Sequence, residues 1–335
     1  MGQVSTSRST SALPDERIPG SLPPTSSGLN VDAQAAVRDL ARTHYENFSV
    51  LSVLVPRPLR PAFAAVYAFC RVSDDLADEG GPGPQARAAA LASLADWRRQ
   101  LHVCFDADQP AVVEHPVFQA LRPVIAQHKL PRKPFDDLLD AFEQDQRTET
   151  YETWAELLAY CDKSASPVGR IVLMLAGYRP PEECPANAAR YELSGAVCVA
   201  LQLTNFWQDV RRDLIERDRV YLPREICGLD RVKLRAWLGE GEGSLHRAEF
   251  AGAVAPCIAR TWALFQRGRE LRALLDRSIG PVVGLFQDGG EHVLRAIERH
   301  EVSTLWHRPR LSRPRKAWLV GRAWLTTLFP TGGRT

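Results

Sequence analysis

The sequence predicts a single all-helical domain, and three of its features support this. Residues 31–306 are rich in Ala, Leu, Arg and Glu, which are good helix formers. Apolar residues recur at spacings of three and four, without the alternating Val/Ile runs that are typical of strands. Pro and Gly cluster between segments of helical length, and we interpret the clusters at residues 56–61, 80–84, 131–134, 177–185, 239–243 and 280–290 as loops. We therefore expect about nine or more helices.

Composition and charge restrict the class of protein. The chain has 335 residues, of which 45% are hydrophobic, so it can bury a sizeable core within one large domain. Its 42 Lys and Arg nearly balance 40 Asp and Glu, which excludes a general nucleic-acid binder. No two of the 7 cysteines have the CxxC spacing, so we expect neither a disulfide framework nor a zinc knuckle. Free thiols favour a cytoplasmic location.

The two ends of the chain differ from its body. Residues 1–30 are rich in Ser, Thr and Pro and predict a disordered tail, although Met1–Thr6 also fits the permissive myristoylation pattern. Residues 307–335 contain Arg and Lys but no acidic residue, interleaved with Trp and Leu. That composition suits either peripheral contact with the inner face of a membrane or a terminal helix packed on the body of the protein. No apolar run reaches the length of a membrane-spanning helix.

A first stripe of polar side chains lies within residues 67–79. On a helix, Tyr67, Arg71, Asp74 and Asp78 fall within about 60° of one another. The neighbouring positions are mostly apolar, which predicts a largely buried helix. Because buried carboxylates need counter-charges, and Arg71 offsets one at most, we expect additional cations here. The alternative is a set of Asp/Arg pairs on an exposed face.

A second stripe lies within residues 202–213. If this segment forms one continuous helix, Gln202, Asn205, Asp209 and Asp213 fall within about 80°. Mg²⁺ prefers oxygen ligands and binds through one or two carboxylates together with substrate phosphates. Two facing stripes therefore predict a Mg²⁺ site that grips a diphosphate and stabilises it as a leaving group. The candidate metal ligands are Asp74, Asp78, Asn205, Asp209 and Asp213.

At these residues the chain resembles the squalene/phytoene synthase family. The two stripes look like the first and second aspartate-rich motifs of that family, and the resemblance extends over most of residues 31–306. Three further segments match in order: residues 44–48 with the His-containing substrate contact, residues 160–170 with the central kinked helix, and residues 219–223 with an Arg-x-Tyr-x-Pro segment. The resemblance implies an isoprenoid-synthase-type helical bundle around a central hydrophobic cavity, with two or three Mg²⁺ ions held beside the substrate diphosphate.

The resemblance also implies roles for individual residues. Arg71 and Arg219 would contact phosphate oxygens, and Tyr67, Tyr160 and Tyr221 would orient diphosphate or water, or face a carbocation. The alternative for each Tyr is a core ring with a satisfied hydroxyl. Asp136 and Asp140 are interpreted mainly as surface charge, and Phe142 and Asp145 as neighbours of the pocket. The other substrate contacts would be His44, Phe48, Ser164, Ala165, Val168, Gly169, Gln202 and Asn205.

Within the family, three short segments favour the bacterial hopanoid branch of hydroxysqualene synthases: residues 44–48, 77–80 and 166–170. That branch implies conversion of presqualene diphosphate to hydroxysqualene by ionisation, rearrangement and capture of water. The alternatives are head-to-head condensation of two farnesyl or geranylgeranyl diphosphates, with or without NADPH, and a noncatalytic helical assembly protein. Other enzymes of the pathway are candidate partners.

Two local features bear on the shape of the pocket. Pro167 is expected to bend its helix, and the small residues beside it would leave either a channel for a long chain or a site of close helix packing. The stretch from Asp213 to Arg219 is one residue longer than the family pattern, which could displace Arg219 and Tyr221.

Overall fold

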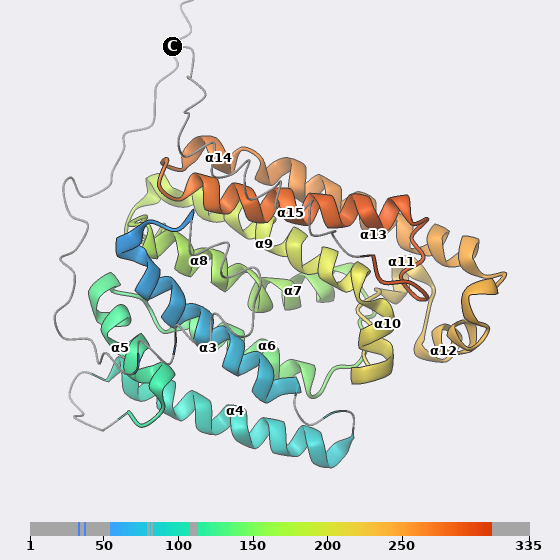
Figure 1. The fold of residues 1–335 in the computed structure, drawn as a ribbon, viewed down its shortest axis with the longest axis horizontal. Helices are drawn as coiled ribbons and strands as arrows, with labels where there is room; N and C mark the ends of the chain where they lie inside the picture. The colour runs from blue at the N-terminus through green and yellow to red at the C-terminus, as the bar shows by residue number, and fades with distance from the viewer. Residues whose placement is uncertain are drawn as a thin grey trace, which may run out of the picture.

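The computed structural model describes residues 33, 37, 54–78, 81, 83–106 and 113–309, and this part of the chain is helical (Figure 1). Among these residues, extended pairing is limited to one isolated bridge between Thr150 and Val220. The all-α prediction is therefore confirmed. The N-terminal tail with its myristoylation pattern, the predicted contacts His44 and Phe48, and nearly all of the basic C-terminal segment lie outside the described residues.

The first half of the domain is built around α3 (Arg60–Asp78). It packs against α4 (Pro84–Phe105), α5 (Pro116–His128) and α6 (Lys133–Asp145). Phe69 of α3 is fully buried among Trp97, Phe118 and Phe135, one from each neighbouring helix. Burial of these large rings fixes the orientation of α3, and with it the direction of the polar stripe that the helix carries.

The second half is built around α9 (Ala188–Gln208), which lies between two layers of helices (Figure 1). On one side are α7 (Trp154–Ser164) and α8 (Ser166–Leu175), and on the other are α13 (Arg247–Gly268) and α15 (Gly280–Arg299). Four short helices complete this half: α10 (Val210–Arg212), α11 (Arg224–Cys227), α12 (Arg231–Gly239) and α14 (Leu271–Leu274). A π-helical turn, η3 (Asp213–Arg217), follows α10 directly.

The loop predicted at residues 280–290 is wrong, because these residues form the first half of α15. Their glycines allow helices to approach closely. A Cβ added to Gly290 would lie 2.8 Å from the Phe265 ring of α13 and would also collide with Leu201 of α9. Glycine is therefore used here for packing rather than for a turn.

The last described residues pack against the C-terminal end of α9. Arg211 donates a hydrogen bond to the Trp306 carbonyl at 3.0 Å, and Gln208 donates one to the Pro309 carbonyl at 2.6 Å. The start of the basic segment thus touches the helical domain at the end where α3, α6 and α9 finish (Figure 1). Within the described ranges, no helix is long and apolar enough to cross a membrane.

Candidate active site

The first polar stripe sits on the last turns of α3, as its spacing predicted. Arg71 donates to Asp74 at 3.2 Å and to both oxygens of Asp75, so its guanidinium is held by its own helix. Asp75 is a partner that the sequence interpretation left out. Asp78, one turn beyond Asp74, is turned toward residues that are distant in the chain.

The second stripe does not lie on one continuous helix, which corrects the prediction for residues 202–213. α9 ends at Gln208, and Asp209 joins it to α10 with φ −104° and ψ 15°. Gln202 is half-buried on α9, Asn205 is exposed near the end of α9, Asp209 stands at the break, and Asp213 is buried at the start of η3. The hydrophobic period does not mark this break, because apolar residues continue at helical spacing through it.

Most of the stretch from Asp213 to Arg219 forms η3. A π-helical turn holds one residue more than an α-helical turn, and such turns are frequent at functional sites. Asp218 then takes a left-handed conformation with φ 54°, and the Arg219 amide donates back to the Asp213 carbonyl at 3.0 Å. Arg219 and Tyr221 consequently remain buried, facing the site.

Arg217 joins the two stripes. Its guanidinium pairs with the Asp78 carboxylate of α3 and with Asp213 Oδ1 at 3.2 Å. Arg219 adds a weaker link, 3.7 Å from Asp78 and 3.8 Å from Asp145. Carboxylates separated by more than 130 residues therefore face one another across the ends of two helices. Arg217 was not among the predicted site residues, since nothing in its local sequence distinguishes it from a solvated charge.

Asp209 is held by a different cation. Arg308, the second residue of the predicted basic segment, binds both oxygens of this carboxylate, with Nη2 at 2.9 Å from Oδ2. Arg212 lies 3.7 Å from the same carboxylate. The described beginning of the segment thus reaches the site itself.

A buried hydrogen-bond network lies behind the carboxylates. Asp145, at the end of α6, accepts a hydrogen bond from the Tyr160 hydroxyl at 2.7 Å and one from the Tyr221 hydroxyl at 3.0 Å. The Tyr221 ring stacks on Phe206 of α9, with centroids 3.9 Å apart. The network orients both predicted tyrosines. Of its members, Asp145 was predicted only as a neighbour of the pocket.

Burial perturbs the acidic groups of the site. Burial, followed by repulsion from Asp78, raises the pKa of Asp74 to about 6. Burial also raises the pKa of Asp213 to about 7, although Arg217 opposes this. The pKa of Asp145 is raised as well, again mainly because it is buried. Burial is the main cause at all three carboxylates, and it favours either a proton or an additional cation beside them.

The donor set fits a Mg²⁺ ion that is held jointly with a ligand. In the described part of the chain, no three acidic, His or Cys side chains lie close enough to enclose a metal by themselves. One or two carboxylates from each side, with the other ligands from phosphate and water, match the usual coordination of Mg²⁺. The oxygens of Asp78 and Asp213 already share one guanidinium, so a cation between them is accommodated.

The predicted bend near Pro167 is present. α7 ends at Ser164, Ala165 takes φ −127° and ψ −46°, and α8 begins at Ser166. The hydroxyls of Ser164 and Ser166 are buried and have no hydrogen-bond partner among the described residues. Unsatisfied buried hydroxyls beside a bend are available to a polar ligand or to water.

Among the small residues beside Pro167, Gly169 shows the close-packing alternative. A Cβ on Gly169 would lie 2.5 Å from the Ser194 hydroxyl and 2.7 Å from the Cys198 sulfur, so Gly169 serves close packing of α8 on α9 rather than a channel. Val168 is exposed, whereas Ala165 is buried at the bend and Tyr67 is half-buried on α3.

Comparison with known proteins agrees with this geometry. The family model described as "Squalene/phytoene synthase" matches residues 41–315. The chain belongs to the squalene/phytoene synthase family. It is therefore a member of an enzyme family that acts on prenyl diphosphates in isoprenoid biosynthesis. The diphosphate chemistry of such enzymes relies on divalent metal.

Individual squalene/phytoene synthase relatives cover most of the chain. The hydroxysqualene synthase of Zymomonas mobilis is 31% identical over 260 residues, 76% of this chain and 80% of the relative. The phytoene synthase of Rhodobacter capsulatus is 30% identical over 303 residues, 89% of this chain and 84% of the relative. The crystal structure of squalene synthase HpnC from Alicyclobacillus acidocaldarius superposes with a TM-score of 0.65 at 38% identity, covering 81% of this chain and 94% of that one.

Proposed function

We propose that this chain is a hydroxysqualene synthase, which converts presqualene diphosphate to hydroxysqualene with Mg²⁺. The observation that carries the proposal is the pairing of Asp78 and Asp213, one from each aspartate-rich motif, with the single guanidinium of Arg217. The choice of branch is supported by the sequence segments around residues 44–48, 77–80 and 166–170, and by relatives that carry this name.

In the proposed site, Asp74, Asp78, Asp209, Asp213 and the Asn205 amide oxygen hold two or three Mg²⁺ ions together with the substrate diphosphate. When bound, the ions neutralise the charge that develops on the leaving diphosphate. Arg71 and Arg219 donate to phosphate oxygens after they release their present carboxylate partners.

The diphosphate leaves with the electron pair of its carbon–oxygen bond, and a cyclopropylcarbinyl cation remains. The rings of Tyr160 and Tyr221, oriented through Asp145, are proposed to stabilise this cation, and Tyr67 is assigned a similar role. Rearrangement and addition of water, with loss of one proton, give the alcohol. His44, Phe48, Ser164, Ala165, Val168, Gly169 and Gln202 are proposed contacts of the hydrocarbon chain in a central hydrophobic cavity, although the packing of Gly169 favours an indirect role for that residue.

A second candidate function is head-to-head condensation of two prenyl diphosphates, as in squalene, dehydrosqualene or phytoene synthases. It is favoured by the phytoene synthase of Rhodobacter capsulatus, which matches a larger share of the chain than the hydroxysqualene synthase of Zymomonas mobilis. A noncatalytic assembly role is disfavoured, because the carboxylates of both motifs are present and converge. The proposed location is the cytoplasm, with peripheral contact at the inner membrane face.

The deciding experiment incubates the purified full chain with presqualene diphosphate and Mg²⁺ in the absence of NADPH, followed by mass analysis. The proposal expects an alcohol product. Unreacted presqualene diphosphate together with active condensation of farnesyl diphosphate would refute it in favour of the condensing reaction. No diphosphate release from any prenyl diphosphate would favour the assembly role.

A first variant tests the carboxylate site. Asp209→Asn removes one charge from a proposed Mg²⁺ ligand and is expected to lower turnover by a factor of at least about 10³ while the fold is retained. Asp162→Asn is the matched control, since Asp162 is an exposed residue whose pair with Arg170 contributes little. Near-normal turnover in Asp209→Asn, with circular dichroism and melting temperature unchanged, would remove Asp209 from the site.

A further inference from the structure

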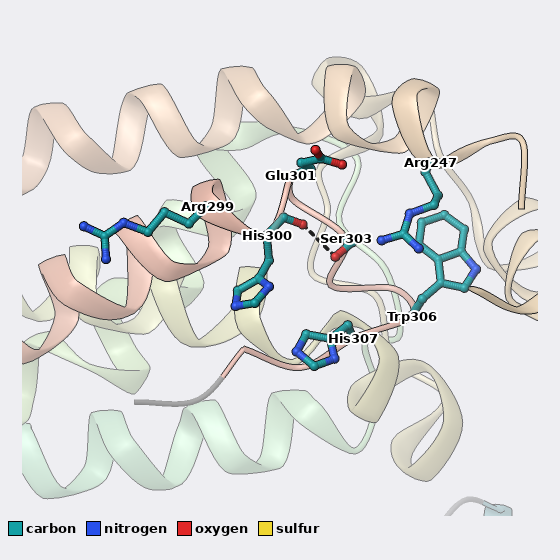
Figure 2. A pocket seen from close by; sticks show the side chains of 7 residues that line it. All are labelled: Arg247, Arg299, His300, Glu301, Ser303, Trp306 and His307. Carbon is teal, nitrogen blue, oxygen red and sulfur yellow. Dashed lines mark hydrogen bonds between the residues drawn. The ribbon is translucent and has the colours of Figure 1, made fainter. Parts of the chain in front are cut away.

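A polar pocket of about 370 Å³ lies outside the proposed active site, between the start of α13 and the end of α15. It shares no residue with the aspartate-rich motifs. Four of its seven lining residues are basic and one is acidic: Arg247, Arg299, His300 and His307 against Glu301, with Ser303 and Trp306 completing the wall. Figure 2 shows the Glu301 carboxylate pointing away from the two imidazole rings.

The two imidazoles come together through the turn that ends α15, whereas Figure 2 shows the Arg299 guanidinium at the rim, pointing away from them. The centroids of the His300 and His307 rings are 5.1 Å apart. The amide and hydroxyl of Ser303 both donate to the His300 carbonyl, and the His307 amide donates to the Ser303 carbonyl, which folds the segment back on itself. Arg247 reaches the same hollow from α13, its guanidinium 5.8 Å from the centroid of the Trp306 ring that forms the floor (Figure 2).

Two details of the backbone show that the local helix structure does not account for the basic side chains gathered here. Arg247 is the first residue of α13, where the free amides of the helix favour an anion rather than a cation. Glu301 and Val302 both take left-handed conformations, with φ 53° and 52°, which a β-branched residue rarely adopts. The carbonyls of Ala296, Ile297 and Glu298 at the end of α15 already accept from the amides of residues 300–302, so these three do not require the nearby cations.

We propose that this pocket binds a phosphate group. A guanidinium can grip two phosphate oxygens at once, and a protonated imidazole donates from either nitrogen. Two sources share this chemistry: the headgroup of an anionic phospholipid and a free phosphate anion. The sequence favours the lipid, because the acid-free basic segment with its Trp and Leu residues follows the pocket directly.

The experiment measures binding of the full chain without added metal to two probes. The first probe is vesicles of phosphatidylcholine with and without phosphatidylglycerol, assayed by co-sedimentation. The second is inorganic phosphate, assayed by calorimetric titration. The variants are Arg299→Gln and the double variant His300→Gln/His307→Gln. The matched control is Arg277→Gln, which removes an exposed guanidinium just before the opposite end of α15.

The proposal expects about tenfold weaker binding in Arg299→Gln and in the double His variant, the effect of losing one charge-assisted hydrogen bond, with Arg277→Gln unchanged. Dependence on phosphatidylglycerol identifies the lipid headgroup as the source, whereas binding of phosphate alone identifies a free anion. The proposal is overturned if the wild type binds neither probe, or if Arg277→Gln weakens binding as much as the pocket variants do. The binding assays contain neither added metal nor prenyl diphosphate, so their result can be read separately from the proposed reaction.

Discussion

Arg217 and a bound metal ion would compete for the same oxygens. The guanidinium occupies the space between Asp78 and Asp213, and only a quarter of its side chain is exposed. Any cation bound there must displace it, and the displaced guanidinium would remain close to the incoming diphosphate. We therefore interpret Arg217 as an internal counter-ion that keeps the carboxylates together when no metal is bound.

This interpretation predicts the behaviour of Arg217→Gln. Loss of the competing charge should tighten binding of Mg²⁺ to the substrate-free protein by about tenfold, as expected for removal of a partly buried ion pair. The measurement is a Mg²⁺ titration followed by thermal stability. Arg235→Gln is the control, because Arg235 pairs with Asp218 beside the site and touches none of the proposed ligands. Equal Mg²⁺ affinity in all three proteins would contradict the role given to Arg217.

Asp145 acts through Tyr160 and Tyr221, which it orients. The effect of an Asp145 substitution on kcat should therefore depend on these two tyrosines. Asp145→Asn is expected to lower kcat by about tenfold or more, with a small change in KM, because an amide donates where both hydroxyls need an acceptor. In a double-mutant cycle with Tyr160→Phe, the two losses should not add. Independent, additive effects on kcat would show that Asp145 only stabilises the fold.

At the scale of helices, Gly289 and Gly290 of α15 form a natural pair of probes. A Cβ on Gly290 would collide with Phe265 and Leu201, whereas one on Gly289 meets nothing within 4 Å. Gly290→Ala should destabilise the fold by about 1–3 kcal/mol through overpacking. Gly289→Ala should stabilise it by up to about 1 kcal/mol, because Ala has the higher helix propensity. Chemical denaturation measures both, and equal effects would contradict the close approach of α15 to α9 and α13.

The same helices show what the sequence can and cannot predict. The stripe on α3 was predictable, since residues at helical spacing on a regular helix must share a face. Period alone does not reveal the break at Asp209 or the π-helical turn at residues 213–217, because apolar residues keep their helical spacing through both. Glycine at residues 280–290 was misread as a turn, since its use in packing depends on a partner helix that is distant in sequence.

Long-range pairs were the least predictable feature of the site. Arg217 and Arg308 look like surface charges in their own segments, and only the folded chain brings them to Asp78 and Asp209. Asp145 was placed near the pocket from the sequence, yet its bonds to Tyr160 and Tyr221 come from two other helices. Residue types at the site are therefore predictable, whereas their partners follow from the way the helices end together.

Over the whole molecule, the convergence of α3, α6 and α9 at one end has an energetic cost that depends on pH. The carboxylate of Asp213 is buried, and its pKa is raised to about 7 from its usual value near 3.8. A group of this kind binds more protons in the folded than in the unfolded state between these two pH values. Its contribution to stability is therefore complete below about pH 4 and is lost as the pH rises through about 7.

The resulting prediction compares wild type with Asp213→Asn in EDTA from pH 4.5 to pH 8, a range that covers most of the interval between about 4 and about 7 and extends above it. Above about pH 7 the variant should be more stable than wild type, by about 2 kcal/mol, and the difference should shrink toward acid pH. The pKa values of other groups are shifted the opposite way. The pKa of Glu291, for example, is lowered by its arginine partners against the effect of burial. Such groups affect both proteins equally, so their contributions cancel in the stability difference between wild type and variant.

Mg²⁺ should stabilise wild type increasingly as pH rises, because protons then no longer compete with it, and should stabilise the variant less. A wild-type curve that runs parallel to that of the variant over the whole range would show that Asp213 is not a strained, proton-binding carboxylate, and would remove the electrostatic reason for a cation at this end of the bundle.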